Sequence, residues 1–380
     1  MRVDVDGKLP VKLWLDTIED EALAQARNLS NLPFAFRHIA IMPDSHVGYG
    51  MPIGGVMATR GVIVPNAVGV DIGCGMIAAR TSLEDISIEN IKAIMGDIRG
   101  AVPVGFNHHD KAREWDGFNA APDLEIINAE LSSATKQLGT LGGGNHFIEI
   151  QRGDDGFIWV MIHSGSRNFG LKTAKAYHEK AVSLCEKWFS NIPNKDLSFL
   201  PLDDIAGRDY LSAMNYCLSF ARANRAEMMR VIKGIFYSRA GAFFPCDIDV
   251  HHNYAIMEHH FGSNVMVHRK GAIRAYAGDI GIIPGSMGTA SYITEGLGNP
   301  ESFMSSSHGA GRRMGRKEAT RTLVLEDEQA KMGSVVHGLR NTSDLDEAPG
   351  AYKDIDEVMS NQMDLVKIVT KLTPLAVIKG

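Results

Sequence analysis

Residues 66–76 read NAVGVDIGCGM, and they place one of the four cysteines of the chain between two glycines, three residues after an aspartate. Glycine leaves the backbone free to form turns that other residues resist, and it lets a ligand approach closely. The Asp71 carboxylate and the Cys74 sulfur, held on such a turn, can therefore point at one spot. A tight turn with a buried thiol is the alternative interpretation, because free cysteines commonly pack as small core residues.

The composition is that of an ordinary soluble globular protein, with 380 residues of which 44% are hydrophobic and 22% are charged. A formal net charge of −6 argues against binding nucleic acid by overall charge, although it leaves room for a local basic groove. Cys74, Cys185, Cys217 and Cys246 are too few and too scattered for a disulfide framework. No apolar run has the length of a membrane span, and the start MRVDVDGKLPV lacks the apolar core of a signal peptide. We therefore expect a cytoplasmic protein whose thiols stay reduced and are available as metal ligands.

Short apolar runs bounded by glycine or proline in the first third (FRHIAIMP, IGGVMATRGVIVP and GMIAARTSL) predict strands of a mostly antiparallel or mixed sheet system. Helical spacing over 171–189 and 206–235 predicts two helices, and strand-like runs return after residue 248. Asp354 stands at an N-cap position, and we interpret 354–371 as a further helix. The chain has no fixed repeat and no Pro/Ser-rich linker. We therefore expect one α+β domain over 1–380, with a helical insertion at roughly 171–240.

Several of the fourteen histidines lie in short loops rather than in long amphipathic patterns, mostly beside glycine, serine or asparagine. They are His46, His146, His163, His251, His252 and His308. One such histidine is ordinary, but this group together with Asp71 and Cys74 predicts that distant loops converge on one site. Imidazole, thiolate and carboxylate ligands favour a borderline metal such as Zn²⁺, Mn²⁺ or Fe²⁺ over Ca²⁺ or Mg²⁺. The spacing matches no zinc-finger pattern, which argues against a structural zinc site.

Glycine-rich runs form a second theme: GGGNH, HSGSRN, PGSMGTAS and HGAGRR. Their backbone N–H groups can cradle an anion, and two of the runs carry an arginine. Such runs near histidines and hydroxyl residues fit polyphosphate chemistry better than carboxylate chemistry. The chain contains no Walker loop and no strand–GxGxxG–helix unit, so neither common nucleotide-binding fold is indicated.

Together these stretches resemble the RtcB RNA ligases. The matching motifs are MPDSHVGYG, VGVDIGCGM, LGGGNHFIE, HSGSR, HHNYA, IPGSMG, SHGAGR, AYKDID and the terminal VIKG, in the expected order from residue 42 to residue 380. The resemblance implies an unusual α+β architecture with sheets around a deep metal-lined cleft. It also implies an enzyme that uses GTP and Mn²⁺ to join an RNA 3′-phosphate or 2′,3′-cyclic phosphate to a 5′-hydroxyl end.

The resemblance carries site residues with it. The metal ligands of the family fall on Asp71, Cys74, His146, His163 and His252, with Cys74 bridging two Mn²⁺ ions, and His308 matches the histidine that accepts GMP covalently. The GTP-binding positions are Asn145, Phe147, Glu149, Ser286, Ser291, Gly309, Ala310, Gly311, Tyr352 and Lys379, among which Phe147 and Glu149 hold guanine. Asp44 matches an acidic residue near the site, and Arg167 and Arg312 suit RNA or GTP phosphates by charge.

The leading hypothesis is therefore ligation through a histidine–GMP intermediate, in RNA repair or tRNA splicing. A two-metal phosphodiesterase or phosphatase is the alternative enzyme, because the same ligand types serve hydrolysis; His308 and the guanine pocket distinguish the two. An inactive RNA-binding or metal-storage protein is the non-enzymatic alternative. We expect a monomer. The physiological RNA, the need for an activating accessory protein, and the assignment of ligands to each ion stay open.

Overall fold

The apolar runs form two large sheets in the computed structural model, which describes all 380 residues. The six-stranded sheet has the order β1 (Arg2–Asp4), β2 (Val11–Leu13), β3 (Ala35–His46), β4 (Ile53–Thr59), β12 (Ser263–Lys270) and β11 (Asn253–His260). The seven-stranded sheet has the order β10 (Cys246–His251), β6 (Gly75–Arg80), β8 (Ile158–Ser164), β7 (Phe147–Gly153), β17 (Val366–Lys379), β15 (Ser291–Gly296) and β14 (Ile280–Ile283). Two short pairs complete the strands: β13 (Ala272–Arg274) with β16 (Ser305–Ser307), and β5 (Val62–Ile63) with β9 (Leu200–Pro201).

Only β2 and β3 pair in parallel, and all the other strand pairs are antiparallel. This confirms the α+β class and the mostly antiparallel sheet predicted from the sequence. Antiparallel neighbours can be joined by short turns, which explains why glycine and proline bound so many of the apolar runs.

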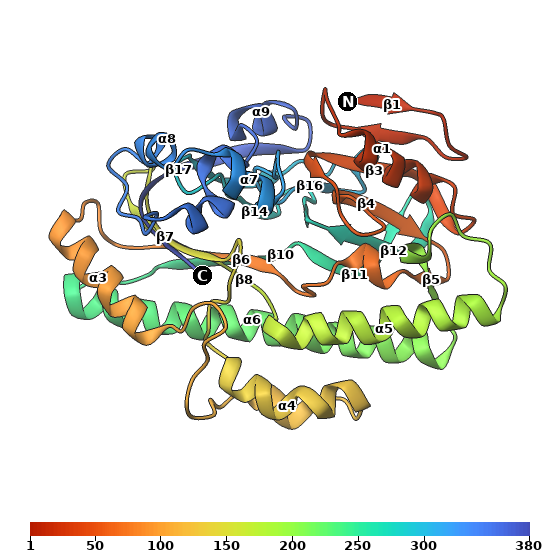
Figure 1. The fold of residues 1–380 in the computed structure, drawn as a ribbon, viewed down its shortest axis with the longest axis horizontal. Coiled ribbons are helices and arrows are strands. Elements are labelled where there is room, and N and C mark those ends of the chain that lie inside the picture. The colour runs from red at the N-terminus through yellow and green to blue at the C-terminus, as the bar shows by residue number, and fades with distance from the viewer.

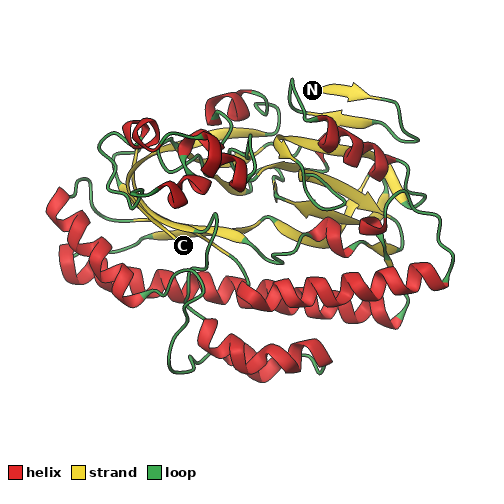
Figure 2. Cartoon of the chain, viewed as in Figure 1, coloured by secondary structure: helices red, strands yellow, loops and turns green.

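The helices lie on both sides of the sheets (Figures 1 and 2). They are α1 (Asp20–Ser30), α2 (Pro65–Val68), α3 (Ile88–Ala101), α4 (Glu125–Gln137), α5 (Arg167–Lys187), α6 (Ile205–Ala240), α7 (Arg316–Thr322), α8 (Leu325–Lys331) and α9 (Ile355–Ser360). The long helices α5 and α6 run side by side beneath the sheets with α4 outside them, and α7, α8 and α9 lie on the opposite side (Figure 1). None of these helices combines the length and the apolar character needed to cross a lipid bilayer.

The helical segment predicted for roughly 171–240 is present as α5 and α6. Helix α6 has 36 residues, a length of about 54 Å at 1.5 Å per residue. It begins after Asp204, whose side chain accepts a hydrogen bond from the backbone N–H of Ala206, and it ends at Gly241 in the left-handed conformation. Because α6 packs on β6 and β8 as well as on α3 and α5, it forms part of the floor beneath the seven-stranded sheet.

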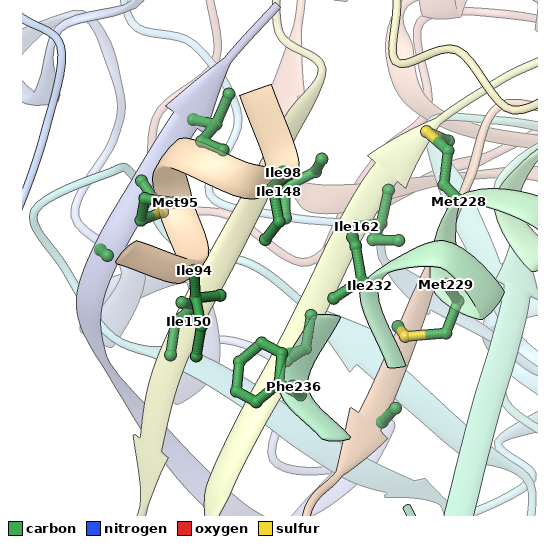
Figure 3. Close-up of a cluster of buried hydrophobic side chains, with 14 of the residues drawn as sticks. Ile94, Met95, Ile98, Ile148, Ile150, Ile162, Met228, Met229, Ile232 and Phe236 are labelled. Carbon is green, nitrogen blue, oxygen red and sulfur yellow. The ribbon is translucent and has the colours of Figure 1, made fainter. Parts of the chain in front are cut away.

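One core cluster joins α3 and α6 to this sheet (Figure 3). The buried side chains that Figure 3 labels in it are Ile94, Met95 and Ile98 of α3, Ile148, Ile150 and Ile162 of the sheet, and Met228, Met229, Ile232 and Phe236 of α6. Apolar residues three and four positions apart lie on one face of a helix, which is why α6 presents Met228, Ile232 and Phe236 together.

The C-terminal segment differs from the sequence prediction. Asp354 does cap a helix, since its side chain accepts from the N–H of Asp356, but α9 ends at Ser360. Residues 366–379 form β17, which pairs with β15 on one side and β7 on the other. The β-branched run at 368–370 favours a strand, and this part of β17 pairs with β15, while the part from Leu372 onward pairs with β7. The prediction of a helix up to residue 371 is therefore wrong beyond α9.

We predict that Ile232→Ala lowers the free energy of unfolding by about 2–5 kcal/mol, because it removes three buried carbons and leaves a cavity between α6 and the sheet. Urea denaturation followed by circular dichroism measures this change. Ile88→Ala is the matched control, since Ile88 is 43% exposed at the start of α3, and it should change stability by less than about 1 kcal/mol. Equal losses in the two variants would contradict this account of the core.

Candidate metal and nucleotide site

A cleft of about 710 Å³ lies among loops and strand ends contributed by both large sheets. The six-stranded sheet contributes the end of β3, the start of β4 and the end of β12, while the seven-stranded sheet contributes Phe147, Glu149 and His163. His308, directly after β16, and Lys379, the last residue of β17, complete the lining. Antiparallel pairing thus brings residues from the whole length of the chain to one cavity.

The NAVGVDIGCGM stretch forms a turn between α2 and β6, as its glycines suggest. The backbone of Gly69 and Gly73 has φ of +100° and +76°, values that residues other than glycine rarely adopt. A Cβ on Gly73 would also come within 3.0–3.1 Å of Ala221 and Leu218 of α6, so the turn packs directly on the helix. Within the turn the N–H of Cys74 donates to the Asp71 carbonyl (3.1 Å), which holds the two residues in one compact loop.

Five potential metal donors, Cys74 among them, converge at one place. Its Sγ lies 3.2 Å from Nε2 of His163 and 3.4 Å from Nε2 of His146. The Nε2 of His146 is 3.2 Å from Oδ2 of Asp71, and the Nε2 of His163 is 3.4 Å from Nε2 of His252. These contacts form two groups, one of Asp71, Cys74 and His146 and one of Cys74, His163 and His252, and they share only the sulfur.

Backbone carbonyls orient two of the imidazoles. The carbonyl of Leu141 accepts a hydrogen bond from Nδ1 of His146 (2.9 Å), and that of Asn145 accepts from Nδ1 of His163 (3.1 Å). The proton on each Nδ1 leaves the Nε2 lone pair directed at the cluster. The Nδ1 of buried His252 has no hydrogen-bond partner.

Burial sets the protonation of these donors. It lowers the pKa of His163 and of His252 well below the usual value, with neighbouring histidines adding to the effect, so both rings are neutral. Burial and the adjacent Asp71 carboxylate raise the pKa of the Cys74 thiol well above its ordinary value. Lone pairs from nitrogen, oxygen and sulfur thus converge at one side of the cleft. This donor set fits a borderline divalent metal ion, which deprotonates a coordinating thiol.

Helix α6 holds the donor loops in place through Asn224, whose side chain is fully buried. Its Oδ1 accepts from the N–H groups of Gly139 and Thr140 at 2.7 and 3.1 Å. Its Nδ2 donates to Oγ of Ser164 and to the carbonyl of Gly165 at 3.2 and 3.1 Å. These partners lie in the segments just before His146 and just after His163.

The next residue of α6, Arg225, is also fully buried and anchors the Cys74 turn. Its Nη1 donates to the carbonyls of Gly73 and Ser164, both at 3.0 Å. Its Nε and Nη2 pair with the two oxygens of Asp249 at 2.9 and 2.8 Å. His251 lies beside this guanidinium, with Nδ1 3.2 Å from Nη2, and therefore supports the loop rather than lining the cleft.

His308 lies at the edge of the donor cluster, with its ring centroid 4.6 Å from that of His252. Oδ2 of Asp44, which is fully buried, lies 2.6 Å from Nδ1 of His308 and also accepts from the backbone N–H of His308 (3.1 Å). The carboxylate fixes the proton on Nδ1, so Nε2 keeps a free lone pair toward the cleft. An imidazole oriented by a carboxylate in this way can act as a nucleophile or as a base.

A second group of charged residues surrounds Glu347 on the opposite wall. Its Oε1 accepts from Arg312 and Arg316, both at 2.9 Å. Its Oε2 accepts from the hydroxyl of Tyr352 and lies 3.6 Å from Nζ of Lys379. Three cations thus surround one carboxylate, with the Asp346 carboxyl group nearby, and they place cationic N–H donors in the wall of the cleft.

Glu149 lies deeper in the same wall and is 2% exposed. It accepts a hydrogen bond from Nε2 of Gln151 (2.7 Å), and the same nitrogen lies 3.1 Å from Oγ of Ser291. Burial raises the pKa of Glu149 to about 8, although the nearby Lys379 ammonium acts against this. Nζ of Lys379 stands 5.6 Å from the ring centroid of Phe147.

The structure places most of the residues predicted from the sequence together. Those that line the cleft are Asp71, Cys74, Asn145, Phe147, Glu149, His163, His252, Ser286, His308, Gly309, Ala310, Gly311, Arg312, Tyr352 and Lys379. His146 and Ser291 lie directly behind them, and Asp44 lies beneath His308.

Arg167 is the exception, because it does not line the cleft. Its Nε donates to Oγ1 of Thr140 (2.9 Å) and its Nη2 to the carbonyl of Gly105 (2.8 Å). The guanidinium therefore braces the loop before His146, and this geometry does not support the predicted phosphate contact.

Other residues of the site were not predicted from the sequence: Gln151, Asn224, Arg225, Lys270, Arg316 and Glu347. Gln151 could have been found, since it lies two residues after Glu149 on one strand and must therefore face the same side. Lys270 is 6% exposed and donates to the carbonyls of Tyr49 and Met51. Because these partners lie far away in the sequence, no local motif marks the lysine as part of the site. Asn224 and Arg225 stand in an ordinary helical pattern that does not show which loops they reach.

Convergent metal donors, a carboxylate-oriented histidine and a cationic wall around one cleft indicate a class of protein: a metal-dependent enzyme of phosphate chemistry. Comparison with known proteins gives the family. A family model described as "tRNA-splicing ligase RtcB" matches residues 25–380. The chain is 39% identical to the RNA-splicing ligase RtcB of Escherichia coli K12, in an alignment that covers 98% of this chain and 97% of that protein.

Archaeal proteins show the same relationship. Identity is 34% with the tRNA-splicing ligase RtcB of Thermococcus kodakarensis, over 100% of this chain and 94% of the other. It is 33% with that of Pyrobaculum aerophilum, over 98% and 95%. The chain therefore belongs to the RtcB family of RNA ligases, as the sequence motifs predicted.

We predict that Cys74→Ala and Cys74→Ser abolish tight binding of transition-metal ions, because both donor groups depend on this sulfur and a hydroxyl is a much poorer bridging ligand. Metal content after loading with Mn²⁺ and gel filtration, measured by mass spectrometry, tests this. Cys246→Ser is the control, since Cys246 is exposed and lies outside the cluster. Full metal stoichiometry in Cys74→Ala would leave Cys74 as an ordinary buried thiol.

Proposed function

We propose that this protein is a GTP- and Mn²⁺-dependent RNA ligase that joins a 3′-phosphate or 2′,3′-cyclic phosphate end to a 5′-hydroxyl end through a covalent His308–GMP intermediate. The observation that carries the proposal is the Asp44–His308 pair, which leaves Nε2 of His308 free beside the donor cluster. Membership of the RtcB family supports RNA as the substrate.

Two ions would be held by the two donor groups, with Cys74 common to both. Bound Mn²⁺ neutralises phosphate charge and stabilises the transition state of phosphoryl transfer. The protein contributes imidazoles whose tautomers are fixed at His146 and His163, in a rigid arrangement, since the donor loops are tied to Asn224 and Arg225.

In the first step Nε2 of His308 attacks the α-phosphorus of GTP, a P–N bond forms, and pyrophosphate leaves. Asp44 stabilises the positive charge that develops on the imidazole, because its oxygen is only 2.6 Å from Nδ1. The phosphoramidate is reactive enough to pass GMP on. While the phosphorylated ring carries a proton on Nδ1, breaking the P–N bond releases a neutral imidazole, which is a good leaving group.

In the second step an oxygen of the RNA 3′-phosphate attacks the same phosphorus, which breaks the P–N bond and frees His308. In the third step the 5′-hydroxyl attacks the phosphorus of the RNA 3′-phosphate, and GMP leaves. A cyclic phosphate is first hydrolysed to the 3′-phosphate. Arg312 and Arg316, which pair with Glu347, provide donors for phosphates in the cleft.

Guanine recognition is assigned to Glu149, with Phe147 and Lys379 beside it. Guanine presents N1–H and an N2 amino group on one edge, and a single carboxylate can accept from both. Adenine has an acceptor at N1 that would oppose the carboxylate, and an unpaired buried polar group costs about 1–3 kcal/mol. The proposed role also explains why a carboxyl group is buried there, where burial raises its pKa to about 8 even though Lys379 and Gln151 act against this.

A two-metal phosphodiesterase or phosphatase has no observation that favours it specifically, because such an enzyme needs neither a nucleophilic histidine nor the buried Glu149. A single 380-residue domain, a monomeric state and a cytoplasmic location stay predictions.

We predict that His308→Ala abolishes covalent labelling of the protein by [α-³²P]GTP in the presence of Mn²⁺, because it removes the atom that forms the P–N bond. Metal content should stay close to that of the wild type, since His308 belongs to neither donor group. The matched control is His108→Ala, in which an exposed histidine outside the cleft is removed. Persistent labelling of His308→Ala would overturn the assignment of the nucleophile.

The raised pKa of Glu149 predicts pH-dependent binding of guanosine, a ligand without titratable phosphates. Below about pH 8 the free carboxyl is mostly protonated, and guanine requires the carboxylate, so affinity should rise from pH 6 to 8 by up to about tenfold per unit and level off above. Calorimetric titration of the metal-free protein measures this. Glu149→Gln should bind guanosine weakly with a flat pH profile and narrow the preference for GTP over ATP. A rise in affinity that persists in Glu149→Gln would place the titrating group elsewhere.

A further inference from the structure

The opening of the cleft has a different chemistry from its interior. Five residues that line it there come from three separate segments, and we call them the mouth patch: Glu21 and Gln25 of α1, Tyr49 of the turn between β3 and β4, and Asn194 and Asp196 of the connection between α5 and α6. None of these five residues is cationic or metal-binding, and none is used in the proposed transfer of GMP.

Tyr49 is 69% exposed, yet its backbone is firmly held. Gln25 forms two hydrogen bonds with the backbone of the preceding Gly48, donating to its carbonyl (2.5 Å) and accepting from its N–H (3.1 Å). The buried ammonium of Lys270 donates to the carbonyl of Tyr49 at 2.7 Å. Gly50 has φ +69°, and a Cβ there would come within 2.9 Å of Asp196. The turn is thus rigid, while the ring that it carries projects into the cleft opening.

The ring of Tyr49 has no partner within the protein. Its hydroxyl forms no hydrogen bond, and the ring stacks on no other aromatic side chain and faces no cation. Scattered exposed apolar residues are normal. A large ring held on a fixed backbone at the opening of a cleft is different, because a planar ligand can stack on it with little loss of conformational entropy.

The charges around Tyr49 exclude phosphate as that ligand. The carboxylates of Glu21 and Asp196 repel anions. The nearby ammonium of Lys270 is engaged by the carbonyls of Tyr49 and Met51, and Arg312, Arg316 and Lys379 lie around Glu347 instead. Glu21 forms no hydrogen bond within the protein, and the closest partner of Asp196 is His178 at 3.9 Å. The Oδ1 of Asn194 is engaged with the N–H of Asp196, which leaves its Nδ2 as a free donor. Free acceptors and a free donor around an aromatic plane suit the edge of a nucleobase.

We propose that the mouth patch binds a nucleobase of the RNA close to the ligated end, stacked on Tyr49 and contacted at its edge by Glu21, Asn194 and Asp196. This inference rests on the proposed function. Lys270 connects the patch to the nucleophile, because a Cβ on the following residue, Gly271, would lie 3.0 Å from Cε1 of His308. A base on Tyr49 therefore belongs to a nucleotide near the reacting phosphate, on either the 5′-hydroxyl strand or the 3′-phosphate strand.

The test is steady-state ligation of two short RNA strands by the Mn²⁺-loaded wild type, Tyr49→Phe and Tyr49→Ala. Loss of the ring should raise the KM for RNA by about tenfold or more, as expected for one stacked base, while labelling by GTP without RNA is unchanged. Tyr49→Phe keeps the stacking surface and should behave like the wild type. Tyr237→Ala is the matched control, since Tyr237 is 64% exposed on α6 outside the cleft.

Substrates with one abasic nucleotide identify the strand. Two substrates are compared, one abasic at the terminal nucleotide of the 5′-hydroxyl strand and the other abasic at that of the 3′-phosphate strand. Only the substrate that lacks the stacked base should be ligated more weakly by the wild type. The same substitution should have little further effect in Tyr49→Ala. Glu21→Gln and Asp196→Asn should change the preference among the four bases at that position.

Different outcomes contradict the base subsite and the proposed ligase function. Ligation by Tyr49→Ala with wild-type KM, or an abasic penalty as large in Tyr49→Ala as in the wild type, would overturn the base subsite alone. Absence of ligation by the wild type, with either strand end, would overturn the proposed function.

Discussion

The site depends most on the hydrogen bonds of the fully buried guanidinium of Arg225. This guanidinium joins the carbonyl before Cys74, the carbonyl after His163 and the carboxylate of Asp249 to one point on α6, while the neighbouring Asn224 holds the loop before His146. Removing one partner from a buried ionic group leaves the other uncompensated and costs about 3–5 kcal/mol. The long helix beneath the sheet therefore acts as a common base for donor loops that lie far apart in the sequence.

The cleft also shows how a protein of net charge −6 can take polyanionic substrates. Arg312, Arg316 and Lys379 are held around Glu347, so their side chains are ordered before a ligand arrives. Preorganised donors need little rearrangement at the moment of reaction. On the other side, the imidazoles of His163 and His252 and the thiol of Cys74 favour their uncharged forms, and a bound metal ion would supply positive charge there.

The sequence predicted the parts of the site that lie in short glycine-rich motifs, because such motifs combine a special backbone with a chemical group. Asp71 and Cys74 were found in this way, and so were His163 and His308. It did not reveal Arg225 or Glu347, whose partners are decided by packing between distant segments. The strand at 366–379 was missed for a related reason: an N-cap at Asp354 signals where a helix begins, but only the pairing with β15 and β7 determines where it stops. Arg167 was assigned by charge alone, and its contacts with Thr140 and Gly105 show that the charge of a residue does not reveal where its side chain points.

The sharing of Cys74 between two donor groups makes their occupancy interdependent. Burial and Asp71 raise the pKa of the thiol and so favour its protonated form, and a cation that takes this sulfur as a ligand would have to displace that proton. A second cation would then meet a sulfur that is already ionised, which favours its uptake, although repulsion between the two cations opposes it. Linkage requires this influence to be equal in both directions. If the ionised sulfur favours the second cation by more than cation–cation repulsion opposes it, the two positions would fill as a pair rather than one by one. The thiol proton would be released when the first cation binds and not when the second one does.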